Sequence, residues 1–211
     1  DLSQIPIDSS VSVSPNIALS YDDSSSMSLA YLPDSVQPGL DSISTSQALC
    51  NPAYYWNGYN KIYYNPAVNY ALPAVPKGFN GLPSDGVFPA GNAKFTSAPV
   101  DGFYNYLGQI TDKVDLSSEY FPTIGWYEGI PVSDYHYTFN GNSFDGNTYT
   151  PCLPDAVYVK KGNDIVGIRA FYYTGPDSKN LTLTIVQNGT PADQQNFANW
   201  YSYYRTRNLM A

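Results

Sequence analysis

Charged residues are scarce in this sequence, and so are the residues that most often perform catalysis or hold zinc. Only 13% of the 211 residues are Asp, Glu, Lys or Arg, and there is a single histidine, His136. No motif places a serine or cysteine nucleophile beside His136, and neither cysteine belongs to a CxxC pair. The sequence therefore predicts a protein that is not an enzyme and that has no cysteine-ligated metal centre.

Basic residues and long apolar runs are also few. Ten Lys and Arg stand against 18 Asp and Glu, and the net charge of -8 repels a phosphate backbone. No apolar run reaches the roughly 20 residues that a membrane-spanning helix needs. We therefore expect no nucleic-acid partner and no membrane span. Because the sequence starts at Asp1 without a Met or a signal peptide, we also expect an exported protein whose signal has been removed.

The two cysteines, Cys50 and Cys152, lie about half the chain apart. In an exported protein, two cysteines without metal-ligand spacing favour one disulfide, and two unrelated buried thiols are the alternative. Closing so long a loop adds about 4 kcal/mol to stability in the chain-entropy model. The sequence thus predicts a Cys50–Cys152 disulfide.

Aromatic residues, proline and glycine are abundant instead, with 21 Tyr, 17 Pro and 16 Gly. From Tyr31 to Pro151 a Pro, Gly or Asn interrupts nearly every apolar stretch, which excludes long helices and favours turns and short strands. The run "NPAYYWNGYNKIYYNPAVNY" has two interpretations. Exposed rings would stack on sugars or form a contact surface, whereas buried rings would fill an irregular core. We favour burial for most of them.

Regular periodicity returns after Pro151. Apolar alternation predicts a three-stranded meander with strands at Ala156–Lys160, Ile165–Tyr173 and Leu181–Val186. In the middle strand, alternation divides the residues into two faces, and we expect the more apolar face to point to the core. That face carries Val166, Ile168, Ala170 and Tyr172, and the other carries Ile165, Gly167, Arg169 and Phe171.

A helix is predicted from Pro191 onward, with Asp193 as its N-cap. Apolar residues recur in it at helical spacing, so one stripe should be buried while Arg205 and Arg207 reach solvent or acids. The stripe consists of Phe197, Trp200, Tyr201 and Tyr204. No stop signal precedes Ala211, so we expect the natural protein to continue.

Asp22, Ser24 and Ser26 directly follow an apolar strand predicted at Asn16–Tyr21. Mg²⁺ prefers hard oxygen ligands in near-octahedral geometry, and one carboxylate with two hydroxyls on a tight loop meets that preference. The alternative is a turn in which these side chains bond their own backbone. The pattern makes Asp22, Ser24 and Ser26 candidate metal ligands.

Four segments in this order resemble the N-terminal region of type IV pilus tip adhesins of the PilC/PilY family. They are "SPNIALSYDDSSSMSLAYLPD", "CNPAYYWNGYNKIYYNPAVNYALP", "AKFTSAPVDGF" and "NFANWYSYYRTRNLMA". In that family the Asp-Ser-rich loop belongs to a von Willebrand factor type A domain, and the Arg-Thr-Arg helix is that domain's first helix. The resemblance therefore implies an incomplete A-like domain interrupted by a long insertion.

On this resemblance, residues 1–28 hold the first strand and the Asp-Ser loop. Residues 29–190 form a Tyr/Pro/Gly-rich insertion with the meander at 156–186, and 191–211 begin the first helix. The expected fold class is mainly β with much irregular structure, α+β overall. The family's metal site also takes a Thr and an Asp from later loops, which do not occur in this sequence. We therefore expect Mg²⁺ or Ca²⁺ to bind weakly at Asp22, Ser24 and Ser26.

The resemblance implies an extracellular protein at the cell surface or pilus that acts in adhesion and pilus assembly. Its expected partners are pilus or minor pilin subunits, the remainder of the adhesin or a second chain, and a host or surface ligand. One alternative is a stand-alone surface or filament subunit that lost the metal function. Another is a secreted carbohydrate-binding module or glycosidase that uses the aromatic rings, with acids such as Asp115 and Glu119.

Overall fold

The computed structural model describes residues 32–33, 51–74, 93–103, 112–120, 143–144, 147–148, 153–206 and 209. Among the elements with described bounds, short strands and 3-10 helices precede an α-helix, which agrees with the expected α+β class. The elements are η3 (Pro52–Tyr55), β1 (Ala98–Pro99), β2 (Lys113–Val114), β3 (Ser143–Phe144), β4 (Asn147–Thr148), η6 (Asp155–Val157), β5 (Tyr158–Lys161), β6 (Asp164–Ile168), β7 (Phe171–Thr174), β8 (Thr182–Ile185), η7 (Val186–Asn188) and α3 (Pro191–Tyr203). The predicted strand Asn16–Tyr21 lies outside the described residues.

The described strands form four two-stranded antiparallel sheets, which pair β1 with β2, β3 with β4, β5 with β6, and β7 with β8. The predicted three-stranded meander is therefore wrong in one respect. Its middle strand is broken at Arg169 and Ala170 into β6 and β7, and each half forms its own hairpin. The strands and their antiparallel neighbours were predicted correctly, but the middle strand is not continuous.

Backbone bonds to distant segments cause this break. The Arg169 N–H donates to Val157 O at 2.8 Å, and the Ala170 N–H donates to Leu116 O at 2.8 Å. Ile168 forms a parallel bridge with Glu119, so the 116–120 segment lies beside β6. The backbone also comes very close there, because a Cβ on Gly167 would lie 1.9 Å from Ser118 O. Glycine at 167 permits this approach.

The predicted faces of the middle strand are wrong as well. Val166 is 50% exposed, whereas Ile165 and Phe171 of the opposite predicted face are buried. Ile168 and Ala170 are buried as expected. A register shift between Val159 and Lys160 and the break after Ile168 reset the alternation, because an extra residue re-aims the side chains that follow it.

Helix α3 begins one turn earlier than its predicted cap. Thr190 is the N-cap: its Oγ1 accepts from the Asp193 N–H at 3.2 Å, and the Asp193 carboxylate accepts from the Thr190 N–H at 2.9 Å. The predicted cap, Asp193, is thus the third helical residue of a capping box. Hydrogen bonds from the Thr190 hydroxyl and N–H lower the pKa of Asp193, which keeps a negative charge at the helix start.

The buried stripe of α3 is confirmed for Phe197, Trp200 and Tyr201, while Tyr204 is half-buried. The prediction for Arg205 is wrong, because its side chain is only 7% exposed. Its guanidinium lies 4.3 Å from the centre of the Tyr201 ring and donates to Tyr201 O. A cation–π contact and a carbonyl partner thus replace the expected solvent. Arg207 lies outside the described residues.

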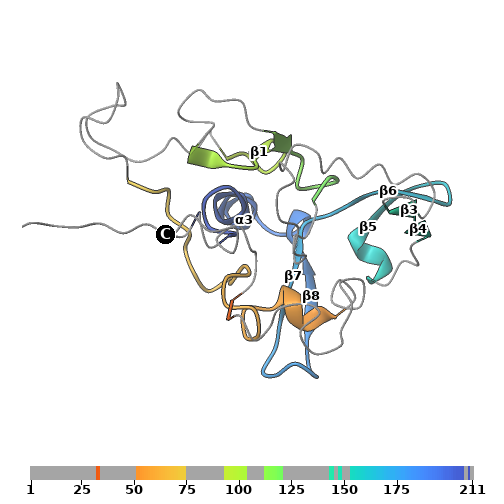
Figure 1. Cartoon of the computed structure of the whole chain (residues 1–211), viewed down its shortest axis with the longest axis horizontal. Helices are drawn as coiled ribbons and strands as arrows, with labels where there is room; N and C mark the ends of the chain where they lie inside the picture. Colours follow the sequence, from red (N-terminus) through yellow and green to blue (C-terminus); the bar gives the residue numbers. More distant parts are fainter. Residues whose placement is uncertain are drawn as a thin grey trace, which may run out of the picture.

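Figure 1 shows α3 near the centre of the molecule, with β1 above it and the β7–β8 hairpin projecting below. Strands β3 to β6 lie at the right of the view. The core around α3 is largely aromatic, and Tyr54, Tyr55, Phe171, Phe197 and Tyr203 are among its largest fully buried side chains. Burial of most rings in the Tyr-rich run is confirmed for the four tyrosines at 54, 55, 63 and 64, while Tyr59 and Tyr70 are half-buried.

Candidate functional site

The residues predicted to bind a metal or to form a disulfide lie outside the described part of the chain. These are the candidate metal ligands Asp22, Ser24 and Ser26 and the candidate disulfide partners Cys50 and Cys152. Their geometry therefore stays a prediction. Three described positions lie close to them in sequence, namely Leu32, Asn51 and Leu153, and the structure shows what holds each one.

Leu32, six residues after Ser26, is bound to the middle of the Tyr-rich segment at 51–74. Its N–H donates to Asn60 Oδ1 at 3.1 Å, and its carbonyl accepts from the Lys61 N–H at 2.8 Å. Asn60 is fully buried, and its Nδ2 also donates to Tyr54 O at 3.3 Å. A buried amide with partners on both sides is costly to remove. Asn60 therefore fixes the chain that leaves the Asp-Ser loop.

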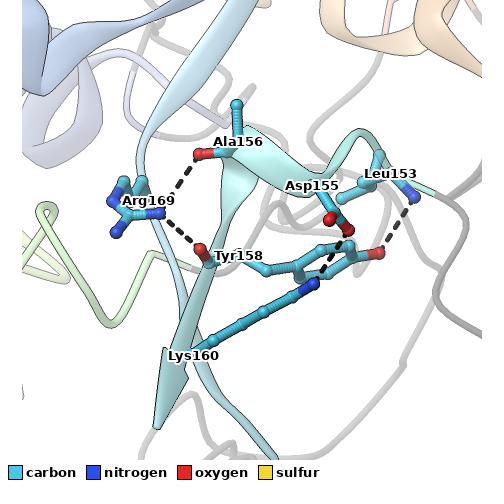
Figure 2. Close-up of polar contacts among 6 residues, drawn as sticks. All are labelled: Leu153, Asp155, Ala156, Tyr158, Lys160 and Arg169. Atoms are coloured by element: carbon cyan, nitrogen blue, oxygen red, sulfur yellow. Dashed lines mark hydrogen bonds and ion pairs between the residues drawn. The ribbon is translucent and has the colours of Figure 1, made fainter. Parts of the chain in front are cut away.

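The residues that follow the two cysteines are held by local bonds. Asn51, after Cys50, caps helix η3 by accepting from the Ala53 N–H at 3.0 Å. Leu153, after Cys152, donates its N–H to the Tyr158 hydroxyl at 2.9 Å. Figure 2 shows the Tyr158 ring reaching back from β5 toward Leu153.

Figure 2 also shows how the start of β5 is held to the chain beyond β6. The Arg169 Nη1 donates to Ala156 O at 3.2 Å and to Tyr158 O. A guanidinium is a donor fork that can serve two carbonyls at once. Lys160 forms an ion pair with Asp155 at 3.0 Å, but Asp155 is largely exposed and the pair adds little.

Helix α3 is joined to the Tyr-rich segment by a row of side-chain amides and one indole, which we call the amide seam. Asn196 Oδ1 accepts from the Tyr70 N–H at 2.8 Å, and its Nδ2 donates to Val68 O at 2.9 Å. Asn199 Nδ2 donates to Tyr70 O at 3.0 Å, and Trp200 Nε1 donates to Ile62 O at 2.9 Å. The seam thus supplies hydrogen bonds to a segment with little regular structure of its own.

A buried pair of tyrosine hydroxyls extends this network into the core. The Tyr63 hydroxyl lies 3.0 Å from the Tyr120 hydroxyl and donates to Phe171 O at 2.7 Å. Burial raises the pKa of Tyr63 well above its usual value and raises that of Tyr120 in the same direction. Burial also raises the pKa of Tyr64 to about 12, although a hydrogen bond from Asn196 opposes the shift. These hydroxyls stay neutral at neutral pH and form structural hydrogen bonds, in which Tyr63 donates to Phe171 O and Tyr64 accepts from Asn196.

The acids considered for a glycosidase pair bind their own turn. Asp115 Oδ1 accepts from the Ser117 hydroxyl at 2.6 Å, and Glu119 Oε2 accepts from the Asp115 N–H at 3.2 Å. Within the described ranges, no three His, Cys, Asp or Glu side chains gather as a metal site. In the same ranges no helix is long and apolar enough to cross a bilayer.

The amide seam and Asn60 were not identified from the sequence. A signal was present for the seam, because Asn196 and Asn199 lie in a helix interior where asparagine is a poor helix former. Asparagine at such positions indicates a partner outside the helix. Asn60 carried no such signal, since asparagine is common in turns.

Comparison with known proteins gives three relatives that share one description, type IV pilus biogenesis factor PilY1, from strains of Pseudomonas aeruginosa. The PAK protein is 30% identical over 99% of this chain, and those of PAO1 and UCBPP-PA14 are each 29% identical over 99%. This chain spans only about 15% of the length of the PAK protein. No protein-family model and no solved structure matches the chain.

Proposed function

Over its own length this chain belongs to the PilY1 family of type IV pilus biogenesis factors, and on that premise we propose that it acts in type IV pilus assembly as a non-catalytic scaffold. The sequence match, which extends over 99% of the chain, carries this proposal. It agrees with the resemblance to the PilC/PilY family drawn from the four quoted segments.

The structure supports a scaffold by what its polar groups do. In the amide seam, Asn196 and Asn199 bond backbone groups of the Tyr-rich segment, and Asn60 bonds the chain at Leu32. The buried hydroxyls of Tyr63 and Tyr120 bond each other. Such groups position segments of the chain rather than perform a reaction.

The test uses a full-length pilus biogenesis factor that contains this chain, expressed in a strain lacking its own copy. Deleting the region, or replacing Trp200 with alanine, should reduce the amount of surface pilin, while Val166→Ala should leave it unchanged. Immunoblots of the factor separate loss of function from loss of the protein. Normal surface pili with the region deleted and the factor at its usual level would refute the proposal.

The finer expectations remain part of this proposal: an exported protein at the cell surface or pilus, adhesion to a host or surface ligand, and contact with pilus or minor pilin subunits. The von Willebrand A-like arrangement, with α3 as first helix, is also proposed. Its support is the resemblance of the Asp-Ser loop and of the Arg-Thr-Arg segment to the family. Cell-surface labelling of the native protein tests its location.

We also propose that Asp22, Ser24 and Ser26 contribute to a Mg²⁺ or Ca²⁺ site. One carboxylate and two neutral hydroxyls dehydrate Mg²⁺ poorly, so this chain alone should bind at best in roughly the millimolar range. In the full-length factor, Asp22→Ala should abolish a tighter binding without unfolding the protein. Calorimetry that found micromolar affinity in the isolated chain, lost in Asp22→Ala, would contradict the incomplete site.

The Cys50–Cys152 disulfide is proposed on the expectation of export. Alkylation of the unfolded, non-reduced protein followed by mass measurement should find no modified cysteine. Two alkylated thiols would show that the cysteines are free.

A further inference from the structure

Strand edges expose unpaired backbone groups, and proteins usually cover or blunt them. Two described hairpins illustrate this. The free side of β5 carries Lys160 and Lys161 and a register shift between Val159 and Lys160, all of which oppose pairing with another strand. The far side of β6 is occupied, because the Ile168 N–H donates to Ser118 O at 3.0 Å and Ile168 O accepts from the Tyr120 N–H at 2.9 Å.

The outer side of β7 is covered too. Phe171 lies opposite Ile185, and the Val186 N–H donates to Ala170 O at 3.0 Å. In an antiparallel ladder, residue pairs that bond each other alternate with pairs that do not. The Val186–Ala170 bond flanks Phe171 and Ile185, so this pair is of the second kind. Its own N–H and C=O groups therefore point away from the hairpin. The Tyr63 hydroxyl donates to the outward Phe171 O at 2.7 Å, as this alternation requires. The Tyr-rich segment therefore lies against that edge at Phe171.

The same alternation exposes the edge of β8. The Tyr173–Leu183 pair lies two residues from the Phe171–Ile185 pair along each strand, so it is of the same kind. The N–H and C=O of Leu183 therefore point away from β7, as does the N–H of Ile185. Among the described residues, none bonds the outward groups of Leu183. The stretch 181–188, "LTLTIVQN", contains no charge, proline or glycine that would blunt the edge.

We propose that the β8 edge binds an extended segment of another polypeptide, which adds a strand beside Thr182–Ile185. The chemistry of the edge defines the segment. Small aliphatic residues should alternate with threonine or serine, because Leu183 lies on the core-facing side and the hydroxyls of Thr182 and Thr184 on the other. Lysine or arginine should flank the paired residues, because this chain carries a net charge of -8.

A second copy of this chain fits the edge less well. Two copies would bring together two chains that each have a net charge of -8, and like charges repel. The shared contact would be a four-residue strand on each side, far below the roughly 1,000 Å² that a stable interface buries. A flexible peptide needs no such area to form a weak, saturable complex.

The test measures binding of a synthetic peptide in which valine and threonine alternate between lysine ends, by fluorescence anisotropy in about 0.15 M salt to screen long-range attraction. The peptide should bind the whole chain saturably, and Leu183→Pro should weaken binding at least about tenfold. This substitution removes an N–H that faces away from β7, which an edge strand tolerates. Circular dichroism confirms that the variant is folded.

A second pair of variants keeps the proposal testable if Leu183→Pro unfolds the chain. Thr182→Lys puts a charge on the edge strand, and Thr174→Lys puts the same charge directly opposite on the inner strand β7. The first should weaken peptide binding several-fold and the second should not. The proposal is wrong if the native chain does not bind the peptide, if both lysine variants behave alike, or if sedimentation shows a dimer that Thr182→Lys disrupts.

Discussion

The Tyr-rich segment at 51–74 contains one four-residue 3-10 helix, η3, as its only assigned helix or strand, whereas the β5–β6 hairpin is paired along nearly all its length. Burial does not follow this difference in regularity. Tyr54, Tyr55, Tyr63 and Tyr64 are each under 5% exposed, while Val166 of the hairpin is 50% exposed. Regular backbone pairing and burial are thus separate sources of order in this molecule.

The difference follows from where each region finds its hydrogen bonds. The hairpin satisfies most of its backbone by pairing its two strands, adds bonds to the 118–120 segment at Ile168, and tolerates solvent at Val166. The Tyr-rich segment lacks such pairing, so side chains of other elements must supply the bonds before the rings can be buried. The amide seam of α3 meets that requirement, and within the segment Asn60 adds a bond to Tyr54 O. We therefore expect stability to respond to single side chains in the Tyr-rich core much more than in the hairpin.

The sharpest test of this comparison is Trp200→Ala. The Trp200 ring centre lies 5.0 Å from that of Phe197 and 5.1 Å from that of Tyr63, and its Nε1 bonds Ile62 O. Truncation leaves a cavity and an unpaired carbonyl, so the free energy of unfolding should fall by about 3–5 kcal/mol. Urea unfolding measures it, with Val166→Ala as the control at under about 1 kcal/mol. Equal costs would end the distinction between the two regions.

Asn60→Ala should have the next largest effect. It removes the acceptor of the Leu32 N–H and the donor to Tyr54 O, both at a fully buried site. The expected loss in unfolding free energy is about 1–3 kcal/mol. Asn69→Ala, at an exposed position of the same segment, should change stability by less than about 0.5 kcal/mol. Hydrogen exchange of the Leu32 amide should accelerate in Asn60→Ala alone, and an unchanged rate would argue against the anchor.

Thr190→Ala probes the start of α3, which supports the amide seam from one end. The variant loses both bonds of the Thr190 hydroxyl, one from the Asp193 N–H and one to the Asp193 carboxylate, so stability should fall by about 1 kcal/mol. Thr190→Ser should restore most of it, because serine caps equally well. Thermal melts of the three proteins provide the comparison, and a fully stable Thr190→Ala would mean that packing alone fixes the helix start.

Alkaline pH should lower the stability of the fold through the buried tyrosines of the aromatic core, without any change at neutral pH. The pKa of Tyr64 is raised from 10.0 to about 12 and that of Tyr63 is raised well above 10.0, chiefly by burial. These groups bind protons in the folded state that the unfolded chain releases above about pH 10. Their stabilisation is therefore complete below about pH 10 and is lost as pH rises beyond it. Tyrosinate absorbance should appear together with unfolding, and ionisation of these rings in a folded chain would contradict their burial.

Several features of the fold were predictable because they depend on local pattern. Alternating apolar residues indicated strands in 156–186, and helical spacing identified the buried stripe of Phe197, Trp200 and Tyr201. The capping box was predictable in principle, since Thr190 and Asp193 have the spacing of that motif. The dense aromatic composition was enough to favour burial of the Tyr-rich run.

By itself the sequence determined the element types, the aromatic core and the membership in a pilus biogenesis family, because propensity, periodicity and rare motifs are properties of the chain alone. Only the tertiary structure decided that the middle strand breaks at Arg169, that Asn60 holds Leu32, that Arg205 is buried on Tyr201, and that, within the described part of the chain, β8 pairs on one side only. The break and the bond to Leu32 depend on partners far away in the sequence, and the burial of Arg205 depends on how the chain packs around it. Such a partner is selected by the free energy of packing the whole chain, which no local pattern contains.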